Sequence, residues 1–328
     1  MIKKESILDN KDNLSSEKMR ISLIIPFFNE EESLLKTLCA INSQTHKAEE
    51  VIFVDSGSTD NSKKIITEYS KLHQELNIKV LFSGKMSPST SINMGIKNSK
   101  FELIAYTDCD LKIPENWLKS NLDSLKKNNS QIVSIKFYTS GEGVIDESFV
   151  AHTYGYKSFS SPLTGSLMYK SVIEQIGYLL PNVRANYDID FYAKLKKNRI
   201  KRSINPNVII KYFGINYCNS FNLGIFKIIK YSEGAWKVKS DKKPYLYIIF
   251  TILFILSIFM NFGMLFLLLY IFLRGFLIPI FKSSHKILFN IPVLLTLPLT
   301  GIMIDTSRVI GYLYIHKLFF SNKLNYDC

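Results

Sequence analysis

The sequence predicts an α/β fold, in which a mostly parallel sheet flanked by helices is followed by an α-helical membrane region. Two observations carry this prediction. Short runs of β-branched and aromatic residues alternate with segments of helical periodicity over the first half of the chain. Such alternation is typical of right-handed strand–helix–strand units, which build parallel sheets with helices on both faces. Residues 245–281 are almost entirely apolar, and a further apolar segment follows at 287–304.

Four strands and the helices between them can be placed from the pattern. The buried-type runs that predict strands are residues 20–26, 51–54, 78–82 and 103–106. Leucine and isoleucine recur at helical spacing after the first three of these runs, and Pro114 permits a further helix after the fourth. The polar residues 1–19 are expected to be flexible, which leaves residues 20–225 for the α/β domain.

Carboxylates follow two of the predicted strands. Asp55 follows the second strand, and Asp108 and Asp110 follow the fourth. Since ligands bind at the carboxyl ends of parallel strands, we expect the three side chains to share one crevice. Asp108 and Asp110 project the same way, and two adjacent negative charges are unfavourable without a positive partner. A divalent cation, Mn²⁺ or Mg²⁺, that completes its shell with substrate phosphates suits them; the alternative is a solvated acidic turn.

Charge and cysteine usage narrow the class of protein. The net charge of +13 suits nucleic acid, anionic lipid or a phosphorylated substrate. Zinc-finger spacing and an RNP-like aromatic strand are both missing from the sequence, so we expect no nucleic-acid partner. The four cysteines are scattered without a C-x-x-C pair, which indicates reduced thiols facing a cytosol. The polar N-terminus does not read as a signal peptide.

Four motifs occur in order between about residue 21 and residue 190: IIPFFNEEESL, VIFVDSGSTDNS, INMGI and IAYTDCD with IPENWL. Together they resemble the family 2 glycosyltransferases, which have a nucleotide-diphospho-sugar-binding (GT-A) fold and invert the anomeric carbon. The resemblance implies that the metal ligands are Asp108 and Asp110. It also implies that the nucleotide-sugar-binding residues are Pro26, Asn29, Glu30, Asp55, Asn93 and Asp108. Independently of the resemblance, residues 30–32 could simply be acids at the start of a helix.

Two departures from the family pattern bear on the donor. The family often has a second acidic residue before the glycine of the second motif, where this chain has Ser56. It often has Arg-Asn before the glycine of INMGI, where this chain has Ile92 and Asn93. The missing arginine removes one possible cation for the diphosphate, so the donor sugar stays open.

A third acidic group lies further along the chain. Tyr187-Asp188-Ile189-Asp190 resembles the family's Glu-Asp-x-Asp motif, with Tyr187 in place of glutamate. By position Asp188 corresponds to the catalytic base, and an acceptor hydroxyl needs such a carboxylate to remove its proton. The alternative for Asp188 and Asp190 is capping of a helix. Residues 161–167 resemble the family segment that covers the sugar and are expected to precede a helix, and a basic helix is expected through residues 194–202.

The last third of the chain predicts a membrane region. Residues 221–236 read as an amphipathic helix at the interface, and residues 226–244 form a basic linker that suits an anionic membrane surface. Residues 245–281 suit two short helices that turn at 261–263 and return to the same side. Prolines 292 and 298 break the segment 287–304, which would span or re-enter. Asp305 and Arg308 are expected to begin a final amphipathic helix to about residue 320, which gives two or three transmembrane helices within residues 245–320.

These features predict a multi-pass membrane glycosyltransferase with a cytoplasmic catalytic domain. It would transfer a single sugar from a nucleotide-diphospho-sugar to a membrane-associated acceptor, a lipid-linked saccharide, in glycan biosynthesis. The Gln-x-x-Arg-Trp motif of processive synthases is missing from the sequence, which favours single transfer. One alternative is a polyprenyl-phosphate sugar synthase, whose acceptor is the lipid phosphate itself. The other is a non-enzymatic membrane protein that binds a nucleotide-sugar.

Overall fold

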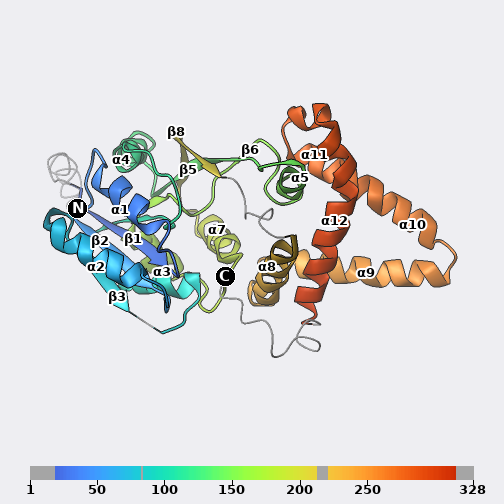
Figure 1. The fold of residues 1–328 in the computed structure, drawn as a ribbon, viewed down its shortest axis with the longest axis horizontal. Coiled ribbons are helices and arrows are strands. Elements are labelled where there is room, and N and C mark those ends of the chain that lie inside the picture. The colour runs from blue at the N-terminus through green and yellow to red at the C-terminus, as the bar shows by residue number, and fades with distance from the viewer. Residues whose placement is uncertain (1–18, 83, 213–220, 315–328) are drawn as a thin grey trace, which may run out of the picture.

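The structure is a computed structural model that describes residues 19–82, 84–212 and 221–314 (Figure 1). The expected flexible segment up to residue 18, the final helix beyond residue 314, and Cys218 and Cys328 lie outside the described residues. Within them, the chain forms one α/β body from which an apolar helical hairpin extends (Figure 1).

The body is built on one eight-stranded sheet with the order β3-β2-β1-β4-β7-β5-β6, and β8 pairs with β5. The strands are β1 (Ile21–Phe27), β2 (Glu50–Asp55), β3 (Ile78–Phe82), β4 (Leu103–Tyr106), β5 (Ile132–Thr139), β6 (Ser158–Ser160), β7 (Leu167–Tyr169) and β8 (Arg202–Tyr212). The four predicted strands pair in parallel. The predicted α/β class is therefore confirmed, and the sheet is mixed because β7 runs antiparallel to β4 and β5.

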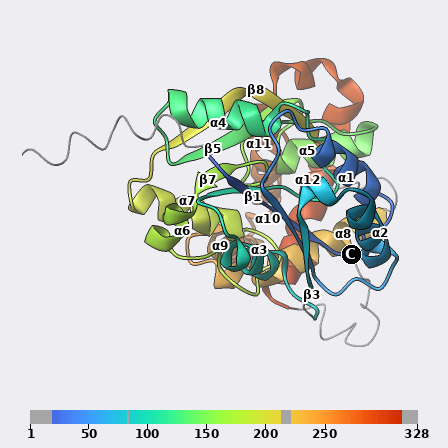
Figure 2. The same ribbon diagram turned by 90° about the vertical axis from the view of Figure 1, so that its left-hand side faces the viewer.

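Helices cover both faces of the sheet (Figure 2). They are α1 (Leu34–Asn42), α2 (Ser62–Leu72), α3 (Pro88–Asn98), α4 (Trp117–Lys127), α5 (Val144–Thr153), α6 (Lys170–Ile176) and α7 (Tyr187–Lys197), with a 3-10 turn η2 (Gln74–Leu76). Alternate residues of β1 enter two different cores, since Leu23 packs with α1, α2 and α4, and Ile24 packs with α3, α6 and α7. A Cβ on Gly95 of α3 would lie 2.4 Å from Cγ2 of Ile24, so the glycine of INMGI permits close helix–strand packing.

Residues 161–167 lead into the helix α6, as expected, with the short strand β7 in between, which fills the gap between β4 and β5. A second prediction about local structure is wrong. The basic helix ends at Lys197, and Arg202 opens β8. Arg199 has the left-handed φ of 55°, which reverses the chain so that β8 can pair with β5.

The apolar hairpin has the predicted turn. Helix α9 (Lys243–Phe259) leads to Asn261, whose φ is 62°, and α10 (Gly263–Tyr270) returns. A π-helical segment η4 (Ile271–Leu277) and α11 (Ile278–Lys282) continue α10 without a break. Before the hairpin lie α8 (Phe221–Glu233), in the region predicted as an amphipathic helix, and the 3-10 turn η3 (Gly234–Lys237). Many large apolar side chains of the hairpin are exposed, including those at its tip.

The last helix, α12 (Ile291–Tyr312), follows a 3-10 turn η5 (His285–Phe289) and runs unbroken through Pro298. The expected break is therefore wrong, and Asp305 and Arg308 lie inside this helix instead of beginning a new one. Pro298 packs against Gly275 of η4, where an added Cβ would lie 3.1 Å from its Cα. Figure 1 shows α12 between the α/β body and the hairpin. Among the described residues, Gly263–Lys282 and Ile291–Tyr312 are long and apolar enough to cross a membrane.

Candidate active site

Asp108 lies just beyond β4 and is held by two hydroxyl groups. The Tyr106 hydroxyl donates to Oδ1 at 2.5 Å, and the Thr164 hydroxyl donates to Oδ2 at 2.8 Å. Tyr106 and Asp108 lie on the same face because they are two residues apart in an extended segment. Burial raises the pKa of Asp108 despite these bonds, and the charge of Asp110 adds to the effect. Asp108 is therefore half-buried and bonded by two hydroxyl groups, which contradicts the alternative interpretation that it lies in a solvated acidic turn.

Glu30, Asp108 and Asp110 lie close enough to one another to form an acidic group. Burial raises the pKa of the Glu30 carboxyl, and the charges of Asp110 and Asp108 raise it further. Asp110 is reached by solvent, yet the surrounding protein raises its pKa through desolvation. The Glu30 carbonyl accepts from the Leu34 N–H at 2.8 Å, so Glu30 lies just before helix α1, which has no acid in its own first turn. The structure thus brings the predicted metal ligands and Glu30 together.

The acidic group fits a divalent cation only with help from a substrate. The charged groups that shift the pKa values of Glu30 and Asp108 are other acids, so the acidic group is electrostatically negative. Within the described residues, however, His, Cys, Asp and Glu do not form a metal-holding group of three or more. Asp108 and Asp110 would hold Mn²⁺ or Mg²⁺ together with the phosphate oxygens of a bound nucleotide.

The loops after β1 and β2 are bonded to each other. Asn29 has a φ of 53°, donates its backbone N–H to the Ser58 hydroxyl at 3.0 Å, and accepts from the Thr59 N–H at 2.8 Å. Asp55 accepts from the Ser58 N–H at 2.8 Å and pairs with the Lys63 ammonium at 3.1 Å. These bonds fix a rigid wall beside the acidic group, at the carboxyl ends of β1 and β2, where Pro26 is half-buried in β1.

Asn93 has a structural role in this fold. Its amide Nδ2 donates to the Leu179 carbonyl at 2.8 Å, and its Oδ1 accepts from the Leu179 N–H at 3.0 Å. The side chain is buried and both of its ends are used by one backbone unit. We therefore assign Asn93 to holding the loop that leads to α7, and we leave it out of the proposed donor site.

A glycine places Thr164 against Asp108. Gly165 has a φ of 81°, and its carbonyl accepts from the Trp117 indole N–H at 2.9 Å and from the Asn121 amide at 3.0 Å. Its own N–H donates to the Tyr106 carbonyl at 2.8 Å. Sequence analysis did not single out Tyr106 or Thr164 as site residues. The sequence did contain a signal for Tyr106, because it lies two residues before Asp108 at the end of a buried strand, and a buried phenol requires a hydrogen-bond partner.

Asp188 lies in the first turn of α7, where its Oδ1 accepts from the Ile189 N–H at 3.0 Å. This bond fits the capping interpretation, and it uses one of the two carboxylate oxygens. Burial raises the pKa of Asp188, and the nearby Lys243 opposes the rise. Asp190 instead pairs with Lys194 at 2.8 Å along the helix, so it has a local structural role.

A pair of tyrosines connects Asp188 with the acidic group. The hydroxyls of Tyr106 and Tyr187 lie 3.4 Å apart, and that of Tyr106 also bonds Asp108. Burial raises the pKa of the Tyr187 hydroxyl, and both Asp108 and Asp188 are close enough to raise it further. Tyr187, which stands where the family pattern has a glutamate, is therefore close to both the acidic group and Asp188. The arrangement brings the acidic group and a separate, half-buried carboxylate into the same region.

Comparison with known proteins places this geometry in context. Residues 22–178 match the family model described as glycosyl transferase family 2. A dolichyl N-acetyl-alpha-D-glucosaminyl phosphate 3-beta-D-2,3-diacetamido-2,3-dideoxy-beta-D-glucuronosyltransferase from Methanococcus voltae is 27% identical over 287 residues, which are 80% of this chain and 84% of the relative. Glycosyltransferase AglE from Haloferax volcanii is 29% identical over 138 residues. That match covers 40% of this chain and less than half, 45%, of the relative.

Among solved structures, the mannosyltransferase PcManGT from Pyrobaculum calidifontis, in complex with GDP-Man and Mn²⁺, has a TM-score of 0.55 to this chain at 15% identity. The match covers 94% of this chain and 89% of that chain. At this identity the likeness shows a shared GT-A fold.

Proposed function

We propose that this chain is a family 2 glycosyltransferase, in line with the match of residues 22–178 to that family model, and that it transfers a single sugar from a nucleotide-diphospho-sugar to a lipid-linked acceptor. The observation that carries the proposal is that Tyr187 is within electrostatic reach of both Asp108, in the acidic group, and Asp188, in a chain that also has an apolar hairpin. The acidic group has the charge to bind a cation, and the cation would in turn bind a diphosphate. Asp188 is half-buried, as suits a base. The hairpin would be the place for a lipid.

The donor would lie along the carboxyl ends of β1, β2 and β4. Asn29 and Asp55 hold the wall at which the base and ribose would lie, and Pro26 and Glu30 flank it. A divalent cation bound by Asp108 and Asp110 would neutralise negative charge on the departing diphosphate. Tyr106 and Thr164 hold the Asp108 carboxylate in a fixed orientation, which lowers the cost of organising the site.

Asp188 would remove the proton from the acceptor hydroxyl as it attacks the anomeric carbon. Burial raises the pKa of this carboxyl, and a raised pKa makes a carboxylate a better proton acceptor near neutral pH. Attack from the face opposite to the diphosphate would invert the configuration at the anomeric carbon in one displacement.

The acceptor is proposed to be a saccharide linked to a membrane lipid. The relative from Methanococcus voltae is named for a dolichyl-linked sugar phosphate, and it matches this chain over most of both lengths. Helix α9 rises over about 25 Å and Gly263–Lys282 over about 30 Å, which suits the hydrocarbon thickness of a bilayer. Lys242 and Lys243 at the start of the hairpin and Lys282 at its end favour one cytoplasmic side for both ends, and with it a cytoplasmic catalytic domain in a multi-pass protein.

The test is sugar transfer in membranes that contain the full chain. Labelled UDP- and GDP-sugars would be screened with lipid-linked acceptors in Mn²⁺, Mg²⁺ or EDTA, against the Asp110→Asn variant. We expect metal-dependent transfer that falls at least about 100-fold in the variant. Transfer directly to a polyprenyl phosphate would instead make the chain a polyprenyl-phosphate sugar synthase. If neither transfer nor metal-dependent nucleotide binding occurred, the protein would be a non-enzymatic one.

A further inference from the structure

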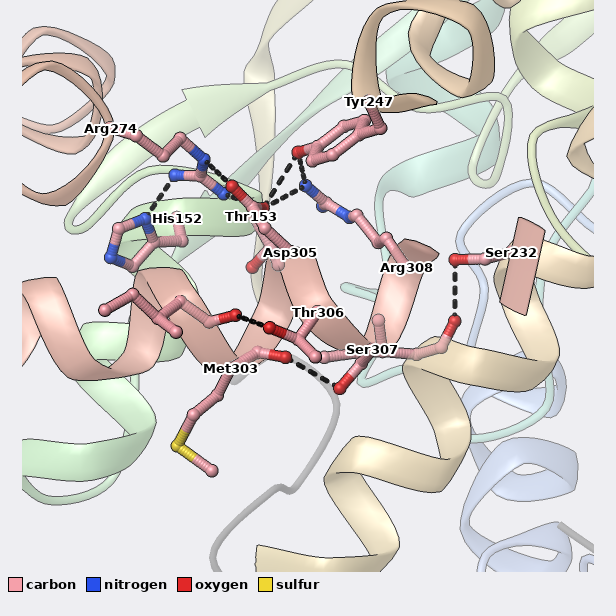
Figure 3. A network of polar contacts seen from close by, with 12 residues as sticks. His152, Thr153, Ser232, Tyr247, Arg274, Met303, Asp305, Thr306, Ser307 and Arg308 are labelled. Atoms are coloured by element: carbon pink, nitrogen blue, oxygen red, sulfur yellow. Dashed lines mark hydrogen bonds and ion pairs between the residues drawn. The ribbon is translucent and has the colours of Figure 1, made fainter. Parts of the chain in front are cut away.

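Polar side chains from several elements meet at the root of the apolar hairpin (Figure 3). Asp305 of α12 accepts from Arg274 of η4 through Nε at 2.7 Å and Nη2 at 2.8 Å. It also accepts from the hydroxyls of Tyr247 on α9 at 2.9 Å and Tyr270 on α10 at 3.1 Å. Arg308, one turn further along α12, donates to the Tyr247 hydroxyl at 2.5 Å and lies 3.5 Å from Asp305.

The cluster has more positive than negative charge. Asp305 is the one carboxylate that bonds Arg274 and Arg308 within the described residues. Lys282 is within electrostatic reach of both arginines, and its ammonium donates to backbone carbonyls of α5. His152 contacts Arg274 but adds no charge at neutral pH, because burial and the guanidinium lower its pKa to about 3. Charges removed from water need compensation, so the surplus cations favour an anion.

Arg308 is the member of the cluster with capacity for such an anion. Arg274 uses both sides of its guanidinium, on Asp305 and on His152. The bonds of Arg308 within the described part of the chain use a single nitrogen, Nη1. Its side chain is 20% exposed, against 12% for Arg274. A guanidinium with a free edge is suited to bidentate binding of phosphate oxygens.

The cluster also lies close to the proposed base. Tyr154 caps the C-terminal end of α5, and burial raises the pKa of its hydroxyl; both Asp188 and Arg308 are close enough to influence it. Lys243, at the start of α9, is within electrostatic reach of both Asp188 and Lys282. The surplus cations therefore lie between the catalytic carboxylate and the apolar hairpin.

We propose that Arg308, supported by Arg274 and Lys282, binds the phosphate that joins the acceptor saccharide to its lipid. This inference rests on the proposed function, since it assigns a subsite to the acceptor. When the hairpin spans a bilayer, Lys282 lies at the level of the headgroups and Arg274 lies about 12 Å further along the helix, so the cluster would receive a lipid phosphate from the headgroup side. The lipid chain then follows the apolar hairpin, and the sugar beyond the phosphate extends towards Asp188.

The first test is direct binding of phytanyl phosphate to the full chain in phosphatidylcholine nanodiscs. Arg308→Gln removes the charge and retains most of the side-chain length, and Arg308→Lys retains the charge. Lys197→Gln, on the exposed end of α7, is the matched control for the loss of one positive charge. We expect Arg308→Gln to weaken binding at least about 10-fold, Arg308→Lys to restore part of it, and Lys197→Gln to bind as the wild type does. Equal binding by wild type and Arg308→Gln would overturn the inference.

A second arm distinguishes the source of the phosphate. If phosphatidylglycerol competed for the site as well as phytanyl phosphate does, Arg308 would bind ordinary headgroups and the acceptor assignment would be wrong. With an active donor, Arg308→Gln should raise KM for a phytanyl-phosphate-linked sugar about 10-fold and leave KM for the donor unchanged. The same sugar on an uncharged phytanyl chain should show no such difference. Failure of wild-type transfer to every lipid acceptor would refute the proposed function, whereas unchanged KM in an active Arg308→Gln variant would refute this inference alone.

Discussion

Replacing Asp188 with asparagine should lower the rate of catalysis without lowering the stability of the fold. The substitution keeps the shape of the side chain and the acceptor for the Ile189 N–H, and it removes the ability to accept a proton. General base catalysis contributes about 10²- to 10⁴-fold to rate, so kcat for transfer to a hydroxyl should fall at least about 100-fold. That loss corresponds to about 2.7 kcal/mol of transition-state stabilisation.

The sign of the stability change is opposite to that of the activity change. Because burial raises the pKa of Asp188 in the folded chain, the folded state takes up a proton more readily than the unfolded state. The contribution of this group to stability is present in full below its unfolded pKa and is lost as the pH rises through its folded pKa. At neutral pH the ionised carboxylate therefore costs stability. Asp188→Asn should melt at the same temperature as the wild type or higher at pH 7, and should lose this advantage in acid.

The matched control is Asp190→Asn, two residues away on the same helix. Asp190 pairs with Lys194 on a partly exposed helix surface, and such pairs contribute about 0.3–0.5 kcal/mol. This variant should keep kcat within about twofold, a difference of less than 0.5 kcal/mol by the same arithmetic. The assay is transfer to the lipid-linked acceptor at saturating donor between pH 5 and pH 8, with melting followed in the same buffers. In the wild type kcat/KM should fall as the pH drops through the raised pKa of Asp188, in addition to any loss from protonation of Asp108 and Asp110, whose pKa values are raised as well. Equal losses of kcat at pH 7 in Asp188→Asn and Asp190→Asn, or an unchanged kcat in Asp188→Asn, would refute the assignment of Asp188 as base.

Three further substitutions test the site and the hairpin. Gly165→Ala should destabilise the protein by about 1–2 kcal/mol from the left-handed backbone alone, with a further cost because its Cβ would lie 2.2 Å from Cδ1 of Ile135. Ile135→Val, which removes that Cδ1, should therefore cost less stability in the Gly165→Ala chain than in the wild type. No loss of melting temperature in Gly165→Ala would contradict the packing. Asn93→Ala should lower the free energy of unfolding by about 1–3 kcal/mol, because it leaves the Leu179 backbone unpaired. KM for the donor should stay within about twofold of the wild-type value. A large rise in that KM at unchanged stability would instead place Asn93 in the donor site. Aspartate at the exposed Phe250 and Leu268 of the hairpin should weaken membrane association by about 2.5–3.5 kcal/mol each, measured by flotation with liposomes, and aspartate at the exposed Leu72 of α2 is the control.

The fold and the positions of Asp108 and Asp110 after a strand could be predicted because they depend on short stretches of sequence. The strands β1 to β4 are short apolar runs, and the position of Asp108 at a strand end follows from the run before it. The hydrogen-bond partners of Asp108 could not all be predicted in this way. Tyr106 is adjacent in sequence, but Thr164 reaches the carboxylate only because β7 inserts antiparallel beside β4 and Gly165 turns the chain. The bonds of Asn93 could not be predicted for the same reason, since its partner Leu179 is 86 residues away.

The charged residues of α12 show most clearly why a local pattern was misleading. An aspartate and an arginine after an apolar segment ordinarily mark the end of a membrane helix, because an unpaired charge in hydrocarbon is costly. Here Arg274, which lies in an equally apolar segment, pairs with Asp305 and offsets the cost of its charge. Neither charge can be explained from its own segment, because its partner lies in the other. The π-helical turn around Arg274 shifts the helix register at this point, and such turns are frequent at functional sites. A polar cluster between a catalytic domain and its hairpin serves anchoring poorly, because an apolar contact of the same size would hold the hairpin without leaving cations in surplus. The surplus is instead what recognition of an anion at the membrane surface requires.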